Sequence, residues 1–342
     1  MRFIKRVSAM VFELVLLLTV FLLMSSPKNA GAQAPRARSV VAYSSLSTQY
    51  APVWVAKEIG YFDRNGLAVD LVFVRGGVIA TQALISGQAR FISSGGGALV
   101  DAVFAGADTV ALASPTTQSD GVLVTKKEIT RLSQLRGKTI GVNSIVGPAM
   151  IALKIILKSA NLDPDRDVKY LAVGSSASRI TALRSGNVDG SIISPPFTLH
   201  ARQAGYTFFD GTAVPALKGI HMPNATIIGR RKTTDAEPRV TEGFVKSVIE
   251  AIHFIKKNKA QTMAILGRYQ RLENVEEIEE AYSQYVDGFA EKPYPSAEAM
   301  RTALESSRRP EAKTADPSMF IDGRFVSQFD KHGFIDSLYK SY

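Results

Sequence analysis

The chain contains no cysteine among its 342 residues, and it contains only four histidines. The absence of cysteine excludes disulfide bonds, thiolate zinc sites, iron–sulfur clusters, cysteine nucleophiles and a lipid-anchored lipoprotein. No HxH or HExxH pattern offers the paired imidazoles of a metal site. The histidines stand far apart in the sequence, at His200, His221, His253 and His332. The sequence therefore predicts a protein without a metal site.

The usual signatures of catalysis and nucleotide binding are also missing. The segment GKT at 137–139 resembles the end of a phosphate-binding loop, but that motif requires glycine at position 132, where this chain has leucine. The glycines at 95–97 are not a dinucleotide-binding fingerprint, because the third glycine of that motif is replaced by Val100. No GxSxG elbow occurs. We therefore expect no enzyme activity and no cofactor. One acidic run has the spacing of a solvent-exposed helix face rather than of a catalytic pair: Glu276, Glu277, Glu279 and Glu280.

The first 32 residues have the pattern of an export signal. Basic residues stand at positions 2, 5 and 6, and residues 14–24 form an apolar run interrupted only by Thr19. The sequence AGA at 30–32 fits a small-residue cleavage site, so we expect the exported protein to begin at Gln33 in the periplasm. An uncleaved anchor is the alternative, but the apolar run is shorter than the ~20 residues that a spanning helix needs.

Positive charge exceeds negative charge without gathering in one place. The formal net charge is +10, and residues 1–32 contribute +3 of it, because they hold four basic residues and one acidic residue. The largest basic block in the remainder is the run Arg230-Arg231-Lys232. A solvated strand end explains so short a block better than a nucleic-acid site does. We therefore expect no nucleic-acid partner.

Strands, polar turns and helices alternate over most of the chain. Apolar runs such as 39–43, 68–74 and 109–113 are followed by turns of small residues and then by helical patterns such as 148–159. The last third is mainly helical and includes a long amphipathic pattern at 240–258. This alternation predicts an α/β fold with mainly parallel strands and helices on both faces of the sheet.

Four polar turns follow predicted strands and contain neither Asp nor Glu: 44–49, 75–77, 94–97 and 143–147. In open α/β sheets, ligands bind at such strand ends, next to helix N-termini. These termini carry partial positive charge, and glycine lets backbone amides approach a ligand closely. We therefore expect a site for a small anionic or neutral polar organic solute rather than for a cation.

Several segments resemble, in chain order, the periplasmic solute-binding proteins of ABC importers, in the branch that binds nitrate, sulfonates, taurine and thiamine pyrimidine precursors. They are APVWVAKEIGYF at 51–62, NGLAVD at 65–70, FVRGG at 73–77, ALISG at 83–87, LRGKTIG at 135–141 and VDGSIISPP at 188–196. One branch of this family is enzymatic and uses a cysteine-rich iron motif. A chain without cysteine cannot supply that motif.

The resemblance implies the type II periplasmic binding protein fold, an α/β architecture of two lobes. Each lobe would be a mostly parallel sheet flanked by helices, with the ligand in the cleft between the lobes. The signal peptide would be residues 1–32, the first lobe 33–125 together with 224–342, and the second lobe 126–223. The chain would cross between the lobes near Val122–Lys126 and return near Pro223–Ile227.

The resemblance also places ligand on the turns described above. Trp54 is expected to pack its helix onto the sheet rather than to stack on ligand, and Arg75 is the basic side chain nearest to a predicted turn. The expected ligand-binding residues are Ser45, Gln49, Arg75, Gly76, Gly77, Ser94, Gly95, Gly96, Asn143, Ser144, Gly147, Ser194, Pro195 and Asn224.

These expectations together describe the substrate-binding component of an ABC-type importer. It would be a monomer that captures its solute in the cleft and delivers it to an inner-membrane permease. The ligand-sensing protein of a signalling system on the same fold is the alternative. Permease and ATPase genes beside its gene would favour import, whereas a sensor kinase gene would favour signalling.

Overall fold

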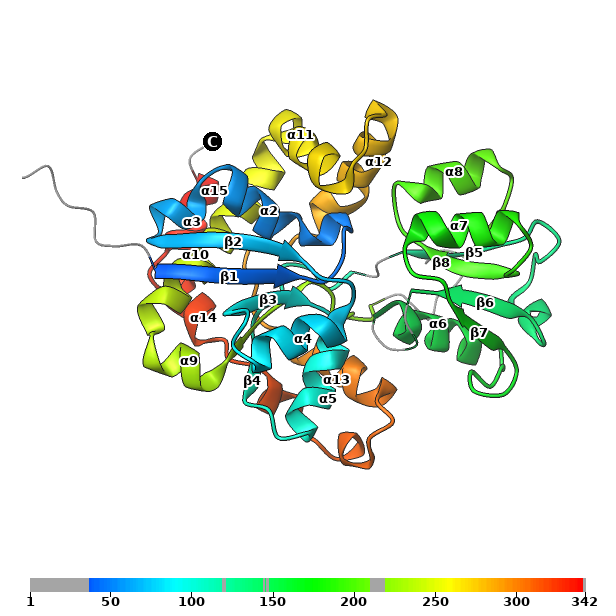
Figure 1. Ribbon diagram of the computed structural model, residues 1–342, viewed down its shortest axis with the longest axis horizontal. Helices are drawn as coiled ribbons and strands as arrows, with labels where there is room; N and C mark the ends of the chain where they lie inside the picture. The colour runs from blue at the N-terminus through cyan, green and yellow to red at the C-terminus, as the bar shows by residue number, and fades with distance from the viewer. Residues whose placement is uncertain (1–36, 119–120, 144, 146–147, 210–218, 341–342) are drawn as a thin grey trace, which may run out of the picture. The chain divides into compact units, whose positions relative to one another are not determined.

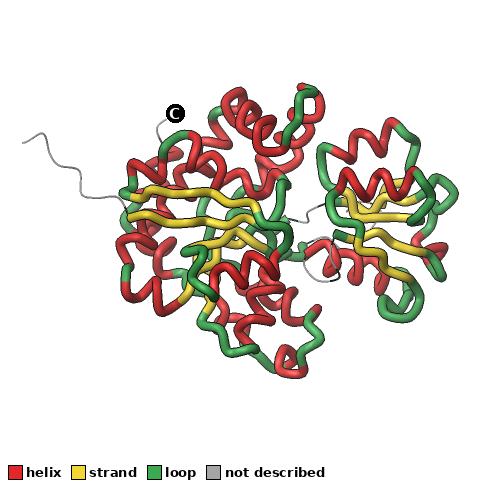
Figure 2. The backbone as a smooth tube through the Cα atoms, viewed as in Figure 1, coloured by secondary structure: helices red, strands yellow, loops and turns green. Residues whose placement is uncertain are grey.

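The computed structural model describes residues 37–118, 121–143, 145, 148–209 and 219–340, so the expected signal peptide lies outside the described residues. The strands from Ala37 onward form two five-stranded sheets (Figure 1). Figure 2 shows that helices surround the strands of both sheets. We call the first sheet with the helices packed on it the first lobe, and the second sheet with its helices the second lobe.

The first sheet has the strand order β2-β1-β3-β10-β4. β1 pairs in parallel with β2 and β3, whereas β10 runs antiparallel between β3 and β4. The carboxyl ends of β1, β2 and β3 therefore meet at one edge of the sheet. The strands are β1 (Ala37–Tyr43), β2 (Leu67–Phe73), β3 (Phe91–Ser94), β4 (Thr109–Ala113) and β10 (Thr226–Arg230).

The second sheet has the order β7-β6-β8-β5-β9, and its one antiparallel strand is β5. Because β5 pairs with β8 along its whole length, the chain is already in the second sheet at Val122. The first crossing therefore ends before the segment Val122–Lys126 where we expected it. The strands are β5 (Val122–Thr125), β6 (Thr139–Val142), β7 (Lys169–Ala172), β8 (Gly190–Ile193) and β9 (Thr207–Phe209).

Alternating strand residues send apolar side chains to both faces of the first sheet. Val41 and Tyr43 join one core cluster, whereas Ala42 joins the other. The first cluster includes residues of α2 (Ala51–Glu58), α3 (Tyr61–Arg64), α10 (Pro238–Lys257), α11 (Lys259–Gln270), α12 (Val275–Tyr285), α14 (Arg324–Lys331) and α15 (Phe334–Lys340). The second includes residues of α4 (Gly77–Ile85), α5 (Gly96–Phe104) and α13 (Ala297–Ser306).

The second sheet is covered on both faces in the same way. Leu123 packs in a cluster with residues of α6 (Pro148–Ser159), whereas Val124 packs with residues of α7 (Ser176–Arg184) and α8 (Phe197–Gln203). The α/β fold with two mostly parallel sheets and helices on both faces is thus confirmed. The short helices are η1 (Thr48–Tyr50), η2 (Leu132–Leu135), η4 (Val286–Gly288), η5 (Pro310–Lys313) and η6 (Pro317–Phe320).

The basic run at 230–232 begins at a strand end, as we expected, because Arg230 is the last residue of β10, and it continues into helix α9 (Arg231–Ala236). Asp108 holds this junction: it accepts from Arg230 Nε at 2.7 Å and from the Lys232 amide at 3.3 Å. The hydrogen bonds from Arg230 and Lys232 lower the pKa of Asp108 against the opposing effect of burial. In the part of the chain that the structure describes, no helix has both the length and the apolar character of a membrane span.

Candidate functional site

The turns that follow β1, β2 and β3 lie together at one edge of the first sheet. The Ser44 amide donates to the Ser93 carbonyl at 3.1 Å, and the Gly76 amide donates to the Ser44 carbonyl at 3.2 Å. These two bonds join three of the predicted binding turns, although the turns are widely separated in the sequence. The parallel order of the strands produces this arrangement.

Ser94 lies at the centre of this edge and is fully buried. No described atom forms a hydrogen bond with its Oγ. A Cβ built on Gly77 would lie 3.0 Å from that oxygen, so the hydroxyl lies beside the first residue of α4. A buried hydroxyl without a partner costs about 1–3 kcal/mol, so a ligand that supplies the missing bond would recover that cost.

Helices α4 and α5 begin on either side of Ser94, and neither has a side-chain cap. Their N-cap residues are Gly76 and Gly95, and Gly76 has a φ of +94°, which only glycine adopts without strain. An uncapped N-terminus leaves backbone N–H groups without an intrahelical acceptor. The two termini and the Ser94 hydroxyl together suit an anionic or polar group.

Gly96 has a different position from the one that we expected. Its amide donates to the Pro223 carbonyl at 2.7 Å, and a Cβ at this residue would lie 2.6 Å from Met300 Cε. The Gly96 amide therefore bonds within the protein, and its missing side chain allows α5, α13 and the returning chain to pack closely.

Gln49 and Asn224 meet at a single backbone carbonyl. Gln49 Nε2 donates to the Gln118 carbonyl at 3.2 Å, and Asn224 Nδ2 donates to it at 2.5 Å. Both side chains are buried. This contact joins the turn after β1 to the two segments that connect the lobes. Sequence reasoning missed Gln118, for which the polar run TTQ at 116–118 after β4 was the available signal.

In the second lobe, Arg179 organises the turn after β8. This arginine is buried and donates from Nε to the Ile192 carbonyl at 2.9 Å and from Nη2 to Ser176 Oγ at 2.8 Å. Ser176 Oγ in turn accepts from the Ser194 amide at 3.3 Å. Ser194 and Pro195 are buried beside this network, whereas Asn143 is exposed. The expected site residues Ser144 and Gly147 lie outside the described residues.

Arg75, Ser45 and Trp54, three other residues discussed from the sequence, lie in the first lobe. Arg75 is exposed on the turn between β2 and α4, and Ser45 Oγ accepts from the Ser47 amide at 3.1 Å. Trp54 is fully buried and packs edge-on against Tyr43 of β1, with ring centroids 5.7 Å apart, which confirms that it packs its helix onto the sheet; it also stacks on Tyr269 of α11 at 5.0 Å. Burial and a 3.0 Å hydrogen bond to Glu58 raise the pKa of Tyr269, so its phenol stays protonated.

A pocket of about 280 Å³ is lined by residues of both lobes, including Gly97 and Ile145 of two predicted turns. Gly97 and Asp101 of α5 line one side, and Ile145 and Met150 line the other. Its lining includes three basic residues, Lys154, Arg308 and Arg309. Among the described residues there is no group of three or more acidic or histidine side chains that could hold a metal ion.

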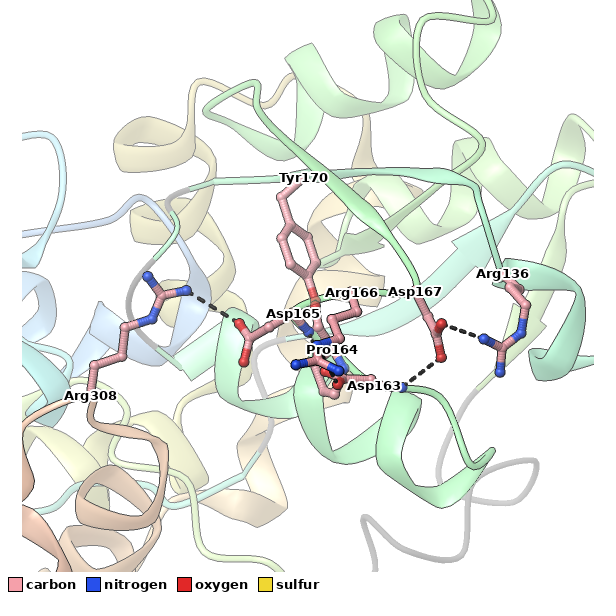
Figure 3. Close-up of polar contacts among 8 residues, drawn as sticks. All are labelled: Arg136, Asp163, Pro164, Asp165, Arg166, Asp167, Tyr170 and Arg308. Atoms are coloured by element: carbon pink, nitrogen blue, oxygen red, sulfur yellow. Dashed lines mark hydrogen bonds and ion pairs between the residues drawn. The ribbon is translucent and has the colours of Figure 1, made fainter.

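Arg308 of the first lobe reaches Asp165 on the loop between α6 and β7, with Nη2 3.3 Å from the carboxylate (Figure 3). The Tyr170 hydroxyl of β7 donates to the Pro164 carbonyl of this loop at 2.5 Å. Burial and the nearby carboxylates raise the pKa of Tyr170 to about 12. Both side chains of the Arg308–Asp165 pair are more than half exposed, so this contact contributes about 0–1 kcal/mol.

Two lobes of this topology, with polar turns at the carboxyl ends of their strands, define the periplasmic-binding-protein fold. The model of the NMT1/THI5-like family matches residues 47–262, and the chain belongs to that family. The chain is 30% identical over 151 residues to the Bacillus subtilis protein YtlA, a match that covers 43% of this chain and 45% of YtlA. It spans less than half the length of the curated relatives it matches.

Solved structures show the same fold at low sequence identity. The periplasmic aliphatic sulphonate-binding protein SsuA from Escherichia coli superposes with a TM-score of 0.63 and 18% identity, over 87% of this chain and 88% of SsuA. The periplasmic nitrate-binding protein NrtA from Synechocystis has a TM-score of 0.66 and 12% identity, over 86% and 89% of the two chains. The fold expected from the sequence is thus confirmed.

Proposed function

We propose that this protein is the solute-binding component of an ABC-type importer, which holds a small anionic or neutral polar organic solute between its lobes. It then delivers the solute to a membrane permease from the periplasmic side. The observation that carries this proposal is the buried Ser94 hydroxyl, which has no partner among the described residues and lies between two uncapped helix N-termini. Family membership and the names of the fold neighbours support it.

The charges near this edge favour an anion over a cation. The turns 44–49, 75–77 and 94–97 contain no carboxylate, and Arg75 is their basic residue. A helix N-terminus stabilises an adjacent anion by about 0.3–1 kcal/mol when exposed and by more when partly buried. A cation would lose its hydration without gaining a carboxylate from these turns. No catalytic step is part of this proposal.

A thermal-shift screen tests the ligand class directly. The protein beginning at Gln33 is mixed with nitrate, bicarbonate, methanesulfonate, taurine and neutral aromatic heterocycles, and separately with putrescine and divalent cations. We expect the melting temperature to rise with members of the first group. A screen in which only cations raise it would overturn the proposed ligand class.

Ser94→Ala is the sharpest test of the site itself. For any anion that raises the melting temperature of the parent, we expect a Kd roughly ten- to a hundredfold higher in the variant, because a hydrogen bond to a charged group contributes about 1.5–3 kcal/mol. Without ligand, the variant should be as stable as the parent or more stable, since it removes a buried hydroxyl that lacks a partner.

Ser39→Ala is the matched control. Ser39 is also buried, its Oγ also lacks a partner among the described atoms, and it lies in the same sheet, on the part of β1 remote from the turns. The control should share the stability effect of Ser94→Ala and keep the parent's affinity. Equal affinity in Ser94→Ala and Ser39→Ala would remove Ser94 from the site.

A further inference from the structure

Two carboxylates of α12 bind the first turn of α8, so they join the two lobes. Glu280 accepts from Thr198 Oγ1 at 2.9 Å and from the Leu199 amide at 3.2 Å. Glu277, one helical turn earlier, lies 2.7 Å from His200 Nε2. The expectation that this acidic run covers a solvent-exposed face is wrong for these two residues. It holds for Glu276, which is exposed.

These contacts are more buried than the ion pair on the loop between α6 and β7. Thr198 is buried, and only 16% of the Glu277 side chain is exposed, against 80% and 59% for Arg308 and Asp165. Burial raises the pKa of Glu280, which indicates a partly desolvated carboxyl. Hydrogen bonds to such groups contribute more than exposed ion pairs do.

The helices in contact both connect to the candidate site. α8 begins directly after Ser194 and Pro195, and its N-cap Pro196 provides no side-chain cap. On the other lobe, α12 contacts η1, which carries Gln49. The carboxylates of α12 therefore connect a predicted binding turn of one lobe with a predicted binding turn of the other.

We propose that Glu277 and Glu280 form an interlobe clamp that positions the turn at Ser194 against the first lobe and favours the closed cleft. The clamp is a pair of positioning residues, since neither carboxylate belongs to the turns assigned to the solute. This inference rests on the proposed function, in which the solute is held between the lobes.

The cysteine-free sequence permits a direct measurement of closure. Spin labels on Glu305→Cys in α13 and Arg184→Cys in α7, two exposed positions in different lobes, report the interlobe distance by pulsed electron spin resonance. We expect the double substitution Glu277→Gln with Glu280→Gln to lower the ratio of closed to open molecules roughly tenfold, because it weakens several charge-assisted bonds together. The measurement uses no ligand, so its outcome is independent of the solute screen.

Two controls define the interpretation. Glu276→Gln changes an exposed carboxylate of the same helix and should leave the distance distribution unchanged. Asp165→Asn breaks the exposed interlobe ion pair and should shift the distribution far less than the clamp variant does. If the clamp variant does not fold, as judged by circular dichroism, Thr198→Val removes one donor of the same contact and should lower the closed fraction. An unchanged distribution, or an equal shift in Glu276→Gln, would overturn the clamp.

Discussion

Single buried atoms carry most of the information about the candidate site. Ser94 and Gly96 are close in the sequence and equally compatible with a binding turn, yet only the Ser94 hydroxyl lacks a partner among the described atoms. The sequence could locate the turn because small residues follow a strand. It could not show that the carbonyl of Pro223, more than a hundred residues later, accepts a hydrogen bond from the Gly96 amide. Partners that are distant in the chain decide which atoms remain for a ligand.

His253 provides a prediction on pH dependence at the scale of a residue. This histidine lies on α10, and its ring packs edge-on against Tyr339 of α15, with ring centroids 4.9 Å apart. Burial, together with the charge of Lys257, lowers the pKa of His253. The unfolded chain therefore binds a proton at a higher pH than the folded chain does. The stability associated with neutral His253 is present above the unfolded pKa of about 6.5 and is lost as pH falls through the folded pKa.

The substitution His253→Phe keeps an aromatic ring against Tyr339 and removes the titrating group. Between about pH 7.5 and about pH 5, we expect the parent to lose more unfolding free energy than this variant, as measured by urea denaturation. Identical losses in the two proteins would show that protonation of His253 is not coupled to folding.

At the scale of the element, local sequence patterns predicted the helices and strands whose bounds depend on neighbouring residues alone. The bounds of α6 and β4 agree with prediction, because apolar runs bounded by proline or glycine define them. β9 was missed, since its three residues form a strand only by pairing with β5. α12 was expected as a helix. Helical spacing alone could not show which of its carboxylates contact α8, because those contacts are made with the second lobe.

Helix α10 provides a prediction in which packing opposes helix propensity. Gly243 lies in this helix, where alanine would be favoured by about 1 kcal/mol. A Cβ there would lie 2.5 Å from the Asn65 carbonyl and 2.8 Å from Leu67 Cδ1. Asn65 also donates to Ser247 Oγ and Glu250 Oε2 of α10 at 3.0 and 2.6 Å, so it cannot shift without breaking these bonds.

We therefore expect Gly243→Ala to lower the free energy of unfolding by about 1–3 kcal/mol, the usual cost of overpacking. Urea denaturation measures the change. Glu242→Ala, at the preceding position of the same helix, is the control and should fall within about 0.5 kcal/mol of the parent. A stabilised Gly243→Ala protein would mean that the helix and the Asn65 turn separate more easily than the contacts indicate.

At the scale of the whole molecule, export and processing remain predictions. The described structure begins at Ala37, and the residues from there onward form one compact unit. We expect protein recovered from the periplasm to begin at Gln33 or within two residues of it, because AGA at 30–32 fits the cleavage pattern. Intact-mass measurement decides the question. A mature protein that retains residues 1–32 would favour the uncleaved anchor.

The two antiparallel strands also determine the order in which the lobes can be completed during synthesis. Every strand of the second sheet is translated between residues 122 and 209, so that sheet can close as soon as this stretch has left the ribosome or the export channel. The first sheet begins earlier but lacks β10 until residue 230, and until then β3 and β4 have no strand between them. The lobe that starts first is therefore finished last. Until β10 arrives, β3 and β4 each have an edge without a partner strand, and such edges promote aggregation.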